Sequence, residues 1–426
     1  MKRIITLLVF AISLAACTPK SNPLVERQLL QLLDEKDLFR LKTQLDENKS
    51  ELPRGIVLYL EARLQNVFNQ TEQSLQTIDA LLTNYGKSLN DTLLYEIFIV
   101  KSDNLHKQNR YREAAEALKI AMEKYGHVSD SAGLISLQET YNTIEPLKDI
   151  PPQKIHITTD VLIPISRNQF DHVLMRVSSG EQTENFIFDT GAMLSVVSEG
   201  CAQRMGIHVL ESSVNVGTSV GNTAQSKVGF ADSLRIGDLL LENVAFLVLP
   251  DESLSFPAAN YAIHGIIGFP VMYQMKEIVI HKDESITVAA RSTKRNLHNL
   301  FLDGLSPYVQ LEANGDTVLF KMDTGANTTE FSERYFEANK DKIKGQATRK
   351  TVKMGGAGGI VEREVYELAN VRLKIGGRDL TIPTITVIPD KLLFLENCDG
   401  NLGQDVLMYF NKLVLNFEDM YLAFEE

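Results

Sequence analysis

One short motif occurs twice in this chain, and its repetition constrains the fold more than any other feature. The strings Asp189–Ala192 and Asp323–Ala326 both read Asp-Thr-Gly-Ala, and each closes a short, largely apolar run. Such runs are typical of buried strands, and a buried carboxylate is costly unless it is paired or hydrogen-bonded. Turn chemistry alone would explain one Asp-Thr-Gly. Two matching carboxylates on two matching strands instead predict one shared site.

The segments around the motif repeat in the same order. The two Asp residues lie 134 positions apart (323 − 189). A glycine-rich stretch follows each of them, Gly217–Asn222 in the first copy and Gly355–Gly359 in the second. Alternating, strand-like runs come next, and then Gly265–Gly268 and Gly400–Gly403, whose last glycines are 135 apart (403 − 268). An unchanged order at a nearly constant offset indicates an internal duplication.

This ordered, doubled set of motifs resembles the aspartic peptidase superfamily. Each unit resembles a retropepsin-like subunit, and the two in tandem resemble the two lobes of a pepsin-like chain, at 154–292 and 293–426. The resemblance implies a catalytic pair, Asp189 and Asp323. It also implies supporting and substrate-covering positions in each unit: a hydrogen-bonded grip between the lobes by Thr190 and Thr324, a close turn at Gly191 and Gly325, and flaps containing Gly217, Gly221, Gly355, Gly356, Gly358 and Gly359.

The chain departs from the family pattern in three respects. Phe269 and Gln404 stand where viral relatives usually carry Arg. Neither glycine-rich stretch contains the Tyr of pepsin-like flaps. Asn401 occupies a position where the family has an apolar residue. These departures bear on flap function and substrate preference.

Two facing carboxyl groups define a reaction. Carboxyls about 3 Å apart cannot both ionise easily, so the pair shares one proton. The ionised member acts as general base on a water held between them, while the protonated member donates to the carbonyl oxygen of a bound amide. We therefore expect an aspartic endopeptidase that hydrolyses peptide bonds of extended polypeptides with a water activated between Asp189 and Asp323. Such a reaction requires no metal and no cofactor.

Two other functions are compatible with the same motifs. The double β unit could hold peptides without cleaving them while the helical region recruits a partner, as in a non-catalytic binding lipoprotein. Alternatively, each unit could carry a separate site that a second chain completes. Retention of both Asp residues in their Thr-Gly context favours hydrolysis, and two complete copies on one chain favour an intramolecular pair.

Alanine after each Asp-Thr-Gly bears on the working pH. A Ser or Thr in place of Ala192 or Ala326 would donate a hydrogen bond to the neighbouring carboxylate and favour its ionised form. Because Ala cannot do so, we expect the pair to stay monoprotonated to higher pH. The optimum should then lie nearer neutrality than in relatives from acidic compartments.

Residues 1–17 have the composition of a targeting segment. Two basic residues precede an apolar stretch that is too short to span a bilayer comfortably. The string Leu14–Cys17 resembles a bacterial lipobox. The resemblance implies cleavage before Cys17 and lipidation of that residue, which would give an exported lipoprotein anchored to a membrane of the cell envelope. The alternatives are an ordinary signal peptide cut near Ala16 and an uncleaved apolar N-terminus.

The pattern of residues 18–148 is helical. Apolar residues recur at three- and four-residue spacing, for example at Leu75, Ile78 and Leu82. The string Asn109–Ala114 resembles the turn between the helices of a tetratricopeptide-like repeat, so we expect two or three helical hairpins. Such an array either binds a protein partner on a concave face or serves as a spacer whose apolar stripes pack on one another. The spacer is the favoured interpretation.

The expected architecture is a multidomain α and β protein, in which a helical-hairpin array precedes a mostly-β, bilobal aspartic-protease-like domain. Pro151 and Pro152 mark the linker between the two regions. The net charge of −12 over 426 residues argues against a nucleic-acid partner. Cys201 and Cys398 fall in different units and are expected to be free, buried thiols. The spacing of the remaining residues offers no metal-binding motif.

Overall fold

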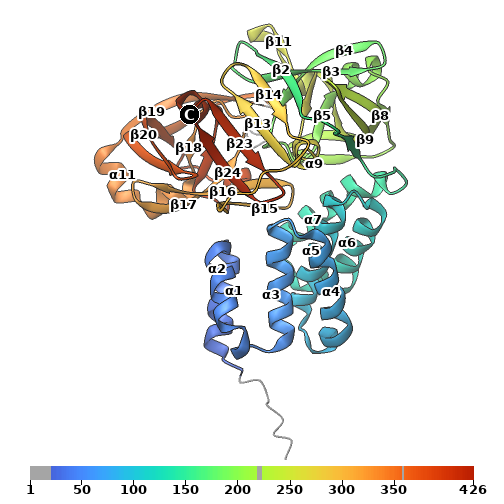
Figure 1. Cartoon of the computed structure of the whole chain (residues 1–426), viewed down its shortest axis with the longest axis vertical. Coiled ribbons are helices and arrows are strands. Elements are labelled where there is room, and N and C mark those ends of the chain that lie inside the picture. Colours follow the sequence, from blue (N-terminus) through green and yellow to red (C-terminus); the bar gives the residue numbers. More distant parts are fainter. Residues whose placement is uncertain (1–20, 218–222, 357–358) are drawn as a thin grey trace, which may run out of the picture.

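The computed structural model describes residues 21–217, 223–356 and 359–426. It has a helical region followed by a mostly-β region of two lobes, as the sequence predicts (Figure 1). The last helical turn ends at Leu147, and the first strand begins at Lys154. Within these ranges no helix combines the length and the apolar character that a membrane span requires.

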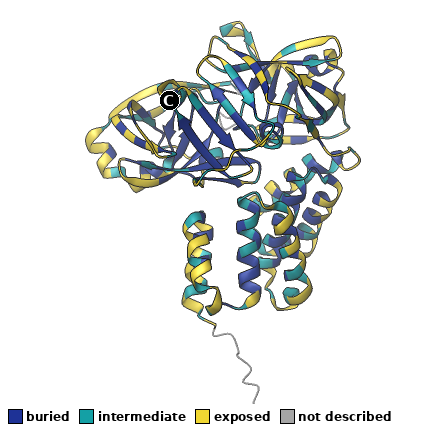
Figure 2. Cartoon of the chain, viewed as in Figure 1, coloured by how far each residue is buried: buried dark blue, intermediate teal, exposed yellow. Residues whose placement is uncertain are grey.

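The helical region contains three hairpins and a closing helix. Lys36, Asn69 and Asn109 adopt a left-handed backbone in the hairpin turns, with φ values of 58°, 60° and 56°, a conformation that Asn tolerates better than most residues. Apolar residues at helical spacing are buried, and the buried positions of the helices are dark blue in Figure 2. The helices are α1 (Pro23–Asp34), α2 (Leu38–Asn48), α3 (Arg54–Val67), α4 (Thr71–Tyr85), α5 (Asp91–Lys107), α6 (Tyr111–Tyr125) and α7 (Ser131–Ile144).

The first lobe is a twisted sheet with two short helices. Its apolar residues alternate with polar ones, so one face of a strand such as Val161–Arg167 is buried and the other is exposed. The elements are β1 (Lys154–His156), β2 (Val161–Arg167), β3 (Val173–Ser179), β4 (Gln182–Phe188), β5 (Ser195–Ser198), α8 (Glu199–Arg204), β6 (His208–Val209), β7 (Val214–Gly217), β8 (Thr223–Ile236), β9 (Leu239–Leu249), β10 (Ser255–Phe256), β11 (Tyr261–Ala262), β12 (Gly265–Ile267), α9 (Phe269–Gln274), β13 (Glu277–His281) and β14 (Ser285–Val288).

The second lobe repeats the central strand pattern of the first. In the first lobe β12 lies between β4, to which it is parallel, and β5, to which it is antiparallel. The second lobe has the same arrangement with β22 between β17 and β18. Its elements are β15 (Leu300–Asp303), β16 (Ser306–Ala313), β17 (Asp316–Met322), β18 (Glu330–Phe331), α10 (Glu333–Ala338), α11 (Lys340–Gln346), β19 (Thr348–Gly356), β20 (Gly359–Ile375), β21 (Arg378–Val387), β22 (Gly400–Leu402), β23 (Lys412–Asn416) and β24 (Tyr421–Glu425).

A shared sheet joins the two lobes. Strand β23 of the second lobe pairs antiparallel with β13 of the first. Val279 and Val414 face each other at the middle of this pairing, 135 positions apart (414 − 279). This offset equals that of the duplication, so equivalent residues meet where the lobes meet. The two lobes are therefore related by an approximate twofold axis through this sheet.

The helical region packs against both lobes. Helix α3 contacts β15 of the second lobe, where Phe301 joins a cluster of buried helical leucines. Helix α7 contacts β7 of the first lobe, where Leu137 and Val214 share a second cluster. Glu139 also accepts hydrogen bonds from the backbone N–H and the side-chain Nδ2 of Asn215, both at 3.0 Å. These contacts hold the first-lobe hairpin β7–β8 against the helices.

Candidate active site

The two Asp-Thr-Gly-Ala motifs lie at equivalent points of the two lobes. Asp189 directly follows β4, and Asp323 directly follows β17. The backbone N–H of Asp189 donates to the carbonyl of Ile267 at 3.1 Å, and that of Asp323 donates to the carbonyl of Leu402 at 3.1 Å. Each carboxyl group is thus presented at the end of a central strand by the same backbone contact.

Two threonines tie the motifs together across the lobe interface. The Thr190 N–H donates to Thr324 Oγ1 at 2.9 Å, and the Thr324 N–H donates to Thr190 Oγ1 at 3.0 Å. Each hydroxyl also donates to a carbonyl of the other lobe, Thr190 to Met322 and Thr324 to Phe188, both at 2.9 Å. Both threonines are fully buried. This reciprocal network positions one motif directly against the other.

The glycines permit the close approach of the two carboxyl groups. A Cβ on Gly191 would lie 2.6 Å from Cγ of Asp323, and a Cβ on Gly325 would lie 2.5 Å from Cγ of Asp189. Atoms do not approach that closely without displacement. Neither glycine has a positive φ, so the requirement for glycine is space for the opposite carboxyl rather than backbone conformation.

The paired carboxyls differ in their proton affinity from isolated ones. Burial and the neighbouring Asp323 raise the pKa of Asp189 to about 7, although the Gly191 N–H and Lys321 act in the opposite direction. Gly191 donates to Asp189 Oδ1 at 2.7 Å. The pair therefore retains one proton up to about neutral pH.

Asp323 has a richer set of donors. Gly325 N–H and Ala326 N–H donate to its Oδ1 at 2.9 and 3.1 Å. Asn401 Nδ2 donates to its Oδ2 at 2.9 Å. Hydrogen bonds to a carboxylate favour the ionised form, so the surroundings of Asp323 favour charge more than those of Asp189 do.

Asn401 is part of a row of three polar side chains on adjacent strands, which we call the polar row. On β22 it is the direct cross-strand neighbour of Lys321 on β17 and of Glu330 on β18. All three residues are buried, none being more than 6% exposed. Lys321 follows Phe320, which is fully buried in β17 of the second lobe. Its Nζ donates to the carbonyl of Gly191 in the first lobe at 3.2 Å.

The first lobe has apolar residues at the three equivalent places. Ile266 on β12 is flanked by Ile187 on β4 and by Val196 on β5. We call these residues the apolar row. The contrast extends to proton affinity, because burial and nearby Asp323 and Asp405 raise the pKa of Glu330 to about 8. A neutral Glu330 is therefore the stable form below that pH.

A histidine from the first lobe also reaches the site. His172 lies between β2 and β3 and is partly buried. Burial lowers the pKa of His172, while Asp323 and a backbone hydrogen bond with Gly325 oppose that effect. Sequence analysis missed His172, Lys321 and Glu330. The charge of Lys321 within an otherwise apolar strand was a signal that pointed to a polar neighbour, and its partners on other strands carry no such signal.

The glycines predicted to form flaps lie at the ends of two hairpins. Gly217 ends β7, while Gly355 and Gly356 end β19. Gly359 begins β20 with φ of 123°, a conformation that residues with a side chain rarely adopt. The predicted positions Gly221, Gly358 and Cys17 lie outside the described residues.

Two further predictions concern cysteines and metals. Cys201 and Cys398 are free and buried, as expected. In the described parts of the chain, no group of three or more His, Cys, Asp and Glu side chains is arranged to hold a metal ion.

A duplicated, two-lobed β fold with paired Asp-Thr-Gly motifs at its axis is typical of aspartic proteases. The family model described as Aspartyl protease matches the chain twice in tandem, at residues 175–271 and 309–406. Both matches contain an Asp-Thr-Gly-Ala motif, and together they support an aspartic-protease-like family for the β region. No curated protein matches the chain.

Proposed function

We propose that the protein is an aspartic endopeptidase that hydrolyses peptide bonds of extended polypeptides. The observation that carries this proposal is the carboxyl pair itself. Reciprocal hydrogen bonds of Thr190 and Thr324 hold the two motifs together, and Asp323 contributes to raising the pKa of Asp189 to about 7. A pair that retains one proton near neutral pH has both the base and the acid that amide hydrolysis requires.

The reaction follows from that single shared proton. The ionised carboxyl takes a proton from a water as the water oxygen bonds to the amide carbon, and the protonated carboxyl donates to the amide oxygen. Collapse of the resulting diol returns a proton to the leaving nitrogen. The contribution of the fold is to hold both carboxyls at one point with little freedom, which lowers the entropy cost of the step.

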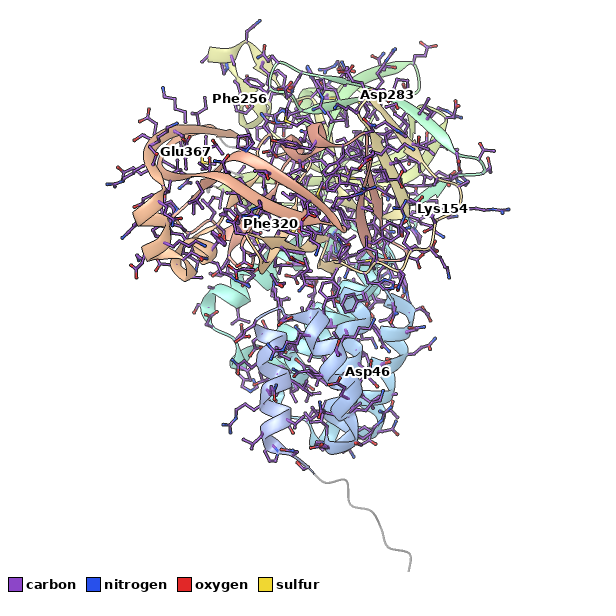
Figure 3. The ribbon with its side chains drawn as sticks, turned by 60° about the vertical axis from the view of Figure 1, so that its left-hand side comes forward. Asp46, Lys154, Phe256, Asp283, Phe320 and Glu367 are labelled. Atoms are coloured by element: carbon purple, nitrogen blue, oxygen red, sulfur yellow. The ribbon has the colours of Figure 1, made fainter. Side chains whose placement is uncertain are left out.

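The most direct test is digestion of a peptide library by the unmodified protein and by Asp189→Asn and Asp323→Asn. Each change should abolish cleavage without lowering the melting temperature, because neither removes a residue of the threonine network. Asp283→Asn is the matched control, since this exposed residue lies at the outer end of the β region, away from the helices (Figure 3). Inhibition by a statine-type transition-state mimic would support the class. Cleavage by either active-site variant would contradict the proposal.

Two alternatives give different results in the same experiment. Peptide binding without cleavage by the unmodified protein would support the non-catalytic binding function. Restored activity on mixing the Asp189→Asn and Asp323→Asn proteins would indicate sites completed by a second chain. An intramolecular pair predicts that the mixture stays inactive.

We also propose that the protein is exported and anchored to a membrane through lipid on Cys17. The lipobox-like sequence supports this proposal. Helix α1 begins at the end of the helical region that is remote from the β lobes (Figure 1), so a tether at that end would favour a spacer role for the helices. Metabolic labelling with an alkyne fatty acid should mark the protein, and Cys17→Ser should lose the label. Labelling that persists in Cys17→Ser would contradict the anchor.

A further inference from the structure

We propose that Asn401 is a positioning residue that makes Asp323 the ionised member of the pair and leaves the shared proton on Asp189. The inference deepens the proposed hydrolysis and rests on it for its functional meaning. In this arrangement Asp323 accepts the proton of the attacking water, and Asp189 donates its proton to the amide oxygen.

The two carboxyl groups differ in the number of hydrogen-bond donors that they face. Asp323 accepts three hydrogen bonds, two from the N–H groups of Gly325 and Ala326 and one from Asn401 Nδ2. Among the described residues, Asp189 accepts one such bond, from the Gly191 N–H. Since each donor stabilises the charged form of a carboxyl group, the negative charge is favoured on Asp323.

The orientation of the Asn401 amide also favours an ionised Asp323. Its Nδ2 faces Asp323, while its buried Oδ1 has no hydrogen-bond partner among the described residues. Leaving a buried acceptor unpaired is unfavourable. A charge-assisted bond from Nδ2 to a carboxylate offsets that cost better than a bond to a neutral acid does. The orientation of the Asn401 amide is thus best explained by an ionised Asp323.

The first lobe has an apolar residue at the place equivalent to Asn401 and so serves as an internal comparison. Ile266 occupies the first-lobe position equivalent to Asn401, and it packs with Ile187 in a buried apolar cluster. It has no group that can donate to Asp189. The two Asp residues differ in one backbone donor, the Ala326 N–H to Asp323, and in one side-chain donor, Asn401, which is the difference that a substitution can remove.

The charged groups around the pair are compatible with this assignment. Lys321 on β17 donates to the carbonyl of Gly191 in the loop after Asp189 and favours ionisation of Asp189. Burial and Asp323 outweigh that effect, since the pKa of Asp189 is still raised to about 7. Glu330 is neutral below about pH 8 and adds no negative charge beside Asn401. Arg363 acts on Glu330 in the opposite direction.

Two further titratable groups lie nearby, His172 beside Asp323 and Asp405 beside Glu330. Burial lowers the pKa of His172, so its ring is neutral near neutral pH. Burial raises the pKa of Asp405, which accepts hydrogen bonds from the N–H and the hydroxyl of Thr329 at 2.9 and 2.6 Å. Neither group donates to Asp189 or Asp323 in place of Asn401.

The test compares two mirror-image variants by their pH–rate profiles. Asn401→Leu removes the donor from Asp323, so ionisation of the pair should become harder and the acidic limb should move up by about one pH unit. The alkaline limb should change less, because Asp323 is ionised on both sides of that step. Ile266→Asn adds a donor beside Asp189 and should instead move the alkaline limb down. Asn401→Gln, which keeps an amide, should restore part of the acidic limb.

A second measurement needs neither activity nor a variant of Asn401. The side-chain carboxyl ¹³C resonances of labelled aspartate report which carboxyl holds the proton in the unmodified protein. Spectra of Asp189→Asn and Asp323→Asn assign the two resonances. Near neutral pH we expect the proton of the pair to be found on Asp189. A proton on Asp323 near neutrality would overturn the inference, as would an acidic limb that Asn401→Leu leaves unmoved.

The two measurements separate failure of the inference from failure of the proposed function. Peptide cleavage together with a proton on Asp323 would leave the hydrolase intact and refute the role of Asn401. Absence of cleavage together with a proton on Asp189 would refute the hydrolase and support the placement of the proton.

Discussion

The two lobes have nearly the same backbone around the carboxyl pair, but the side chains on the strands beside it are apolar in the first lobe and polar in the second. The reciprocal bonds between Thr190 and Thr324 differ by only 0.1 Å, at 2.9 and 3.0 Å. In contrast, the apolar row of the first lobe is matched in the second by the polar row of Lys321, Asn401 and Glu330. Groups on the twofold axis must serve both lobes, so they stay alike. Groups beside the axis serve one carboxyl each, so they can differ.

A single duplicated chain can have different residues beside its two carboxyl groups, whereas a pair of identical chains cannot. In a symmetric homodimer each residue beside one carboxyl recurs beside the other, so neither carboxyl has a built-in preference for the proton. A single chain that encodes both halves can place an amide beside Asp323 and an isoleucine beside Asp189. The burial of three polar side chains is unfavourable by itself, which suggests that the polar row is retained for its effect on the site.

The comparison predicts the largest and most equal effects at the two glycines. Gly191→Ala and Gly325→Ala each place a Cβ about 2.5 Å from the opposite carboxyl, so the carboxyls must separate. We expect each change to lower kcat/KM roughly 1,000-fold, about 4 kcal/mol of barrier. Gly345→Ala is the control, because a Cβ there meets no atom within 4 Å. An alanine variant of either glycine with near-normal activity would show that close approach at that lobe is unnecessary.

The threonines should behave as equals in stability. Thr190→Val and Thr324→Val each remove a buried hydroxyl that accepts one hydrogen bond and donates another. Because a buried N–H and a buried carbonyl then lose their partner, each variant should lose about 3 kcal/mol of unfolding free energy in urea titrations. Thr→Ser at the same positions should retain most of it. Losses that differ by much more than about 0.5 kcal/mol would break the symmetry of the network.

The symmetric part of this site was accessible from the sequence, and the asymmetric part was largely not. Asp189 and Asp323 could be identified from the sequence because their whole motif recurs at a constant offset. The polar row is different, because Lys321, Glu330 and Asn401 become neighbours only through strand register. Sequence analysis noted Asn401 as a departure from the family pattern without locating its partner. The helical region was predictable as hairpins from periodicity, whereas its contact with both lobes depends on surface packing that no pattern encodes.

Glu330 should make stability depend on pH through a group that the first lobe lacks at the equivalent place. The pKa of Glu330 is raised from 4.5 to about 8, so the folded state binds more protons than the unfolded state between these values. The contribution of Glu330 to stability is therefore most favourable below the unfolded pKa and becomes less favourable as pH rises toward 8. Glu330→Gln removes this dependence and should stabilise the protein by about 2 kcal/mol at pH 6, with little effect at pH 4.

The control for Glu330 is its first-lobe equivalent. Val196→Thr should change the unfolding free energy by the same amount at every pH, because neither side chain titrates. Urea titrations from pH 4 to pH 8 measure both effects. Parallel stability profiles for the unmodified protein and Glu330→Gln would mean that Glu330 is ionised in the folded state.

The smallest effect should come from the charge of Lys321. The pKa of Asp189 is about 7 despite the opposing influence of Lys321, so the alkaline limb of the pH–rate profile should lie near that pH. Lys321→Met removes a positive charge that favours ionised Asp189. The pKa of Asp189 should therefore rise further, and the alkaline limb should move up by about half a pH unit. Ile187→Met, at the equivalent place in the first lobe, should leave the limb unmoved. An acidic limb that moves up while the alkaline limb stays in place would show that Lys321 acts chiefly on Asp323, and Lys321 and Asn401 would then act on the same carboxyl.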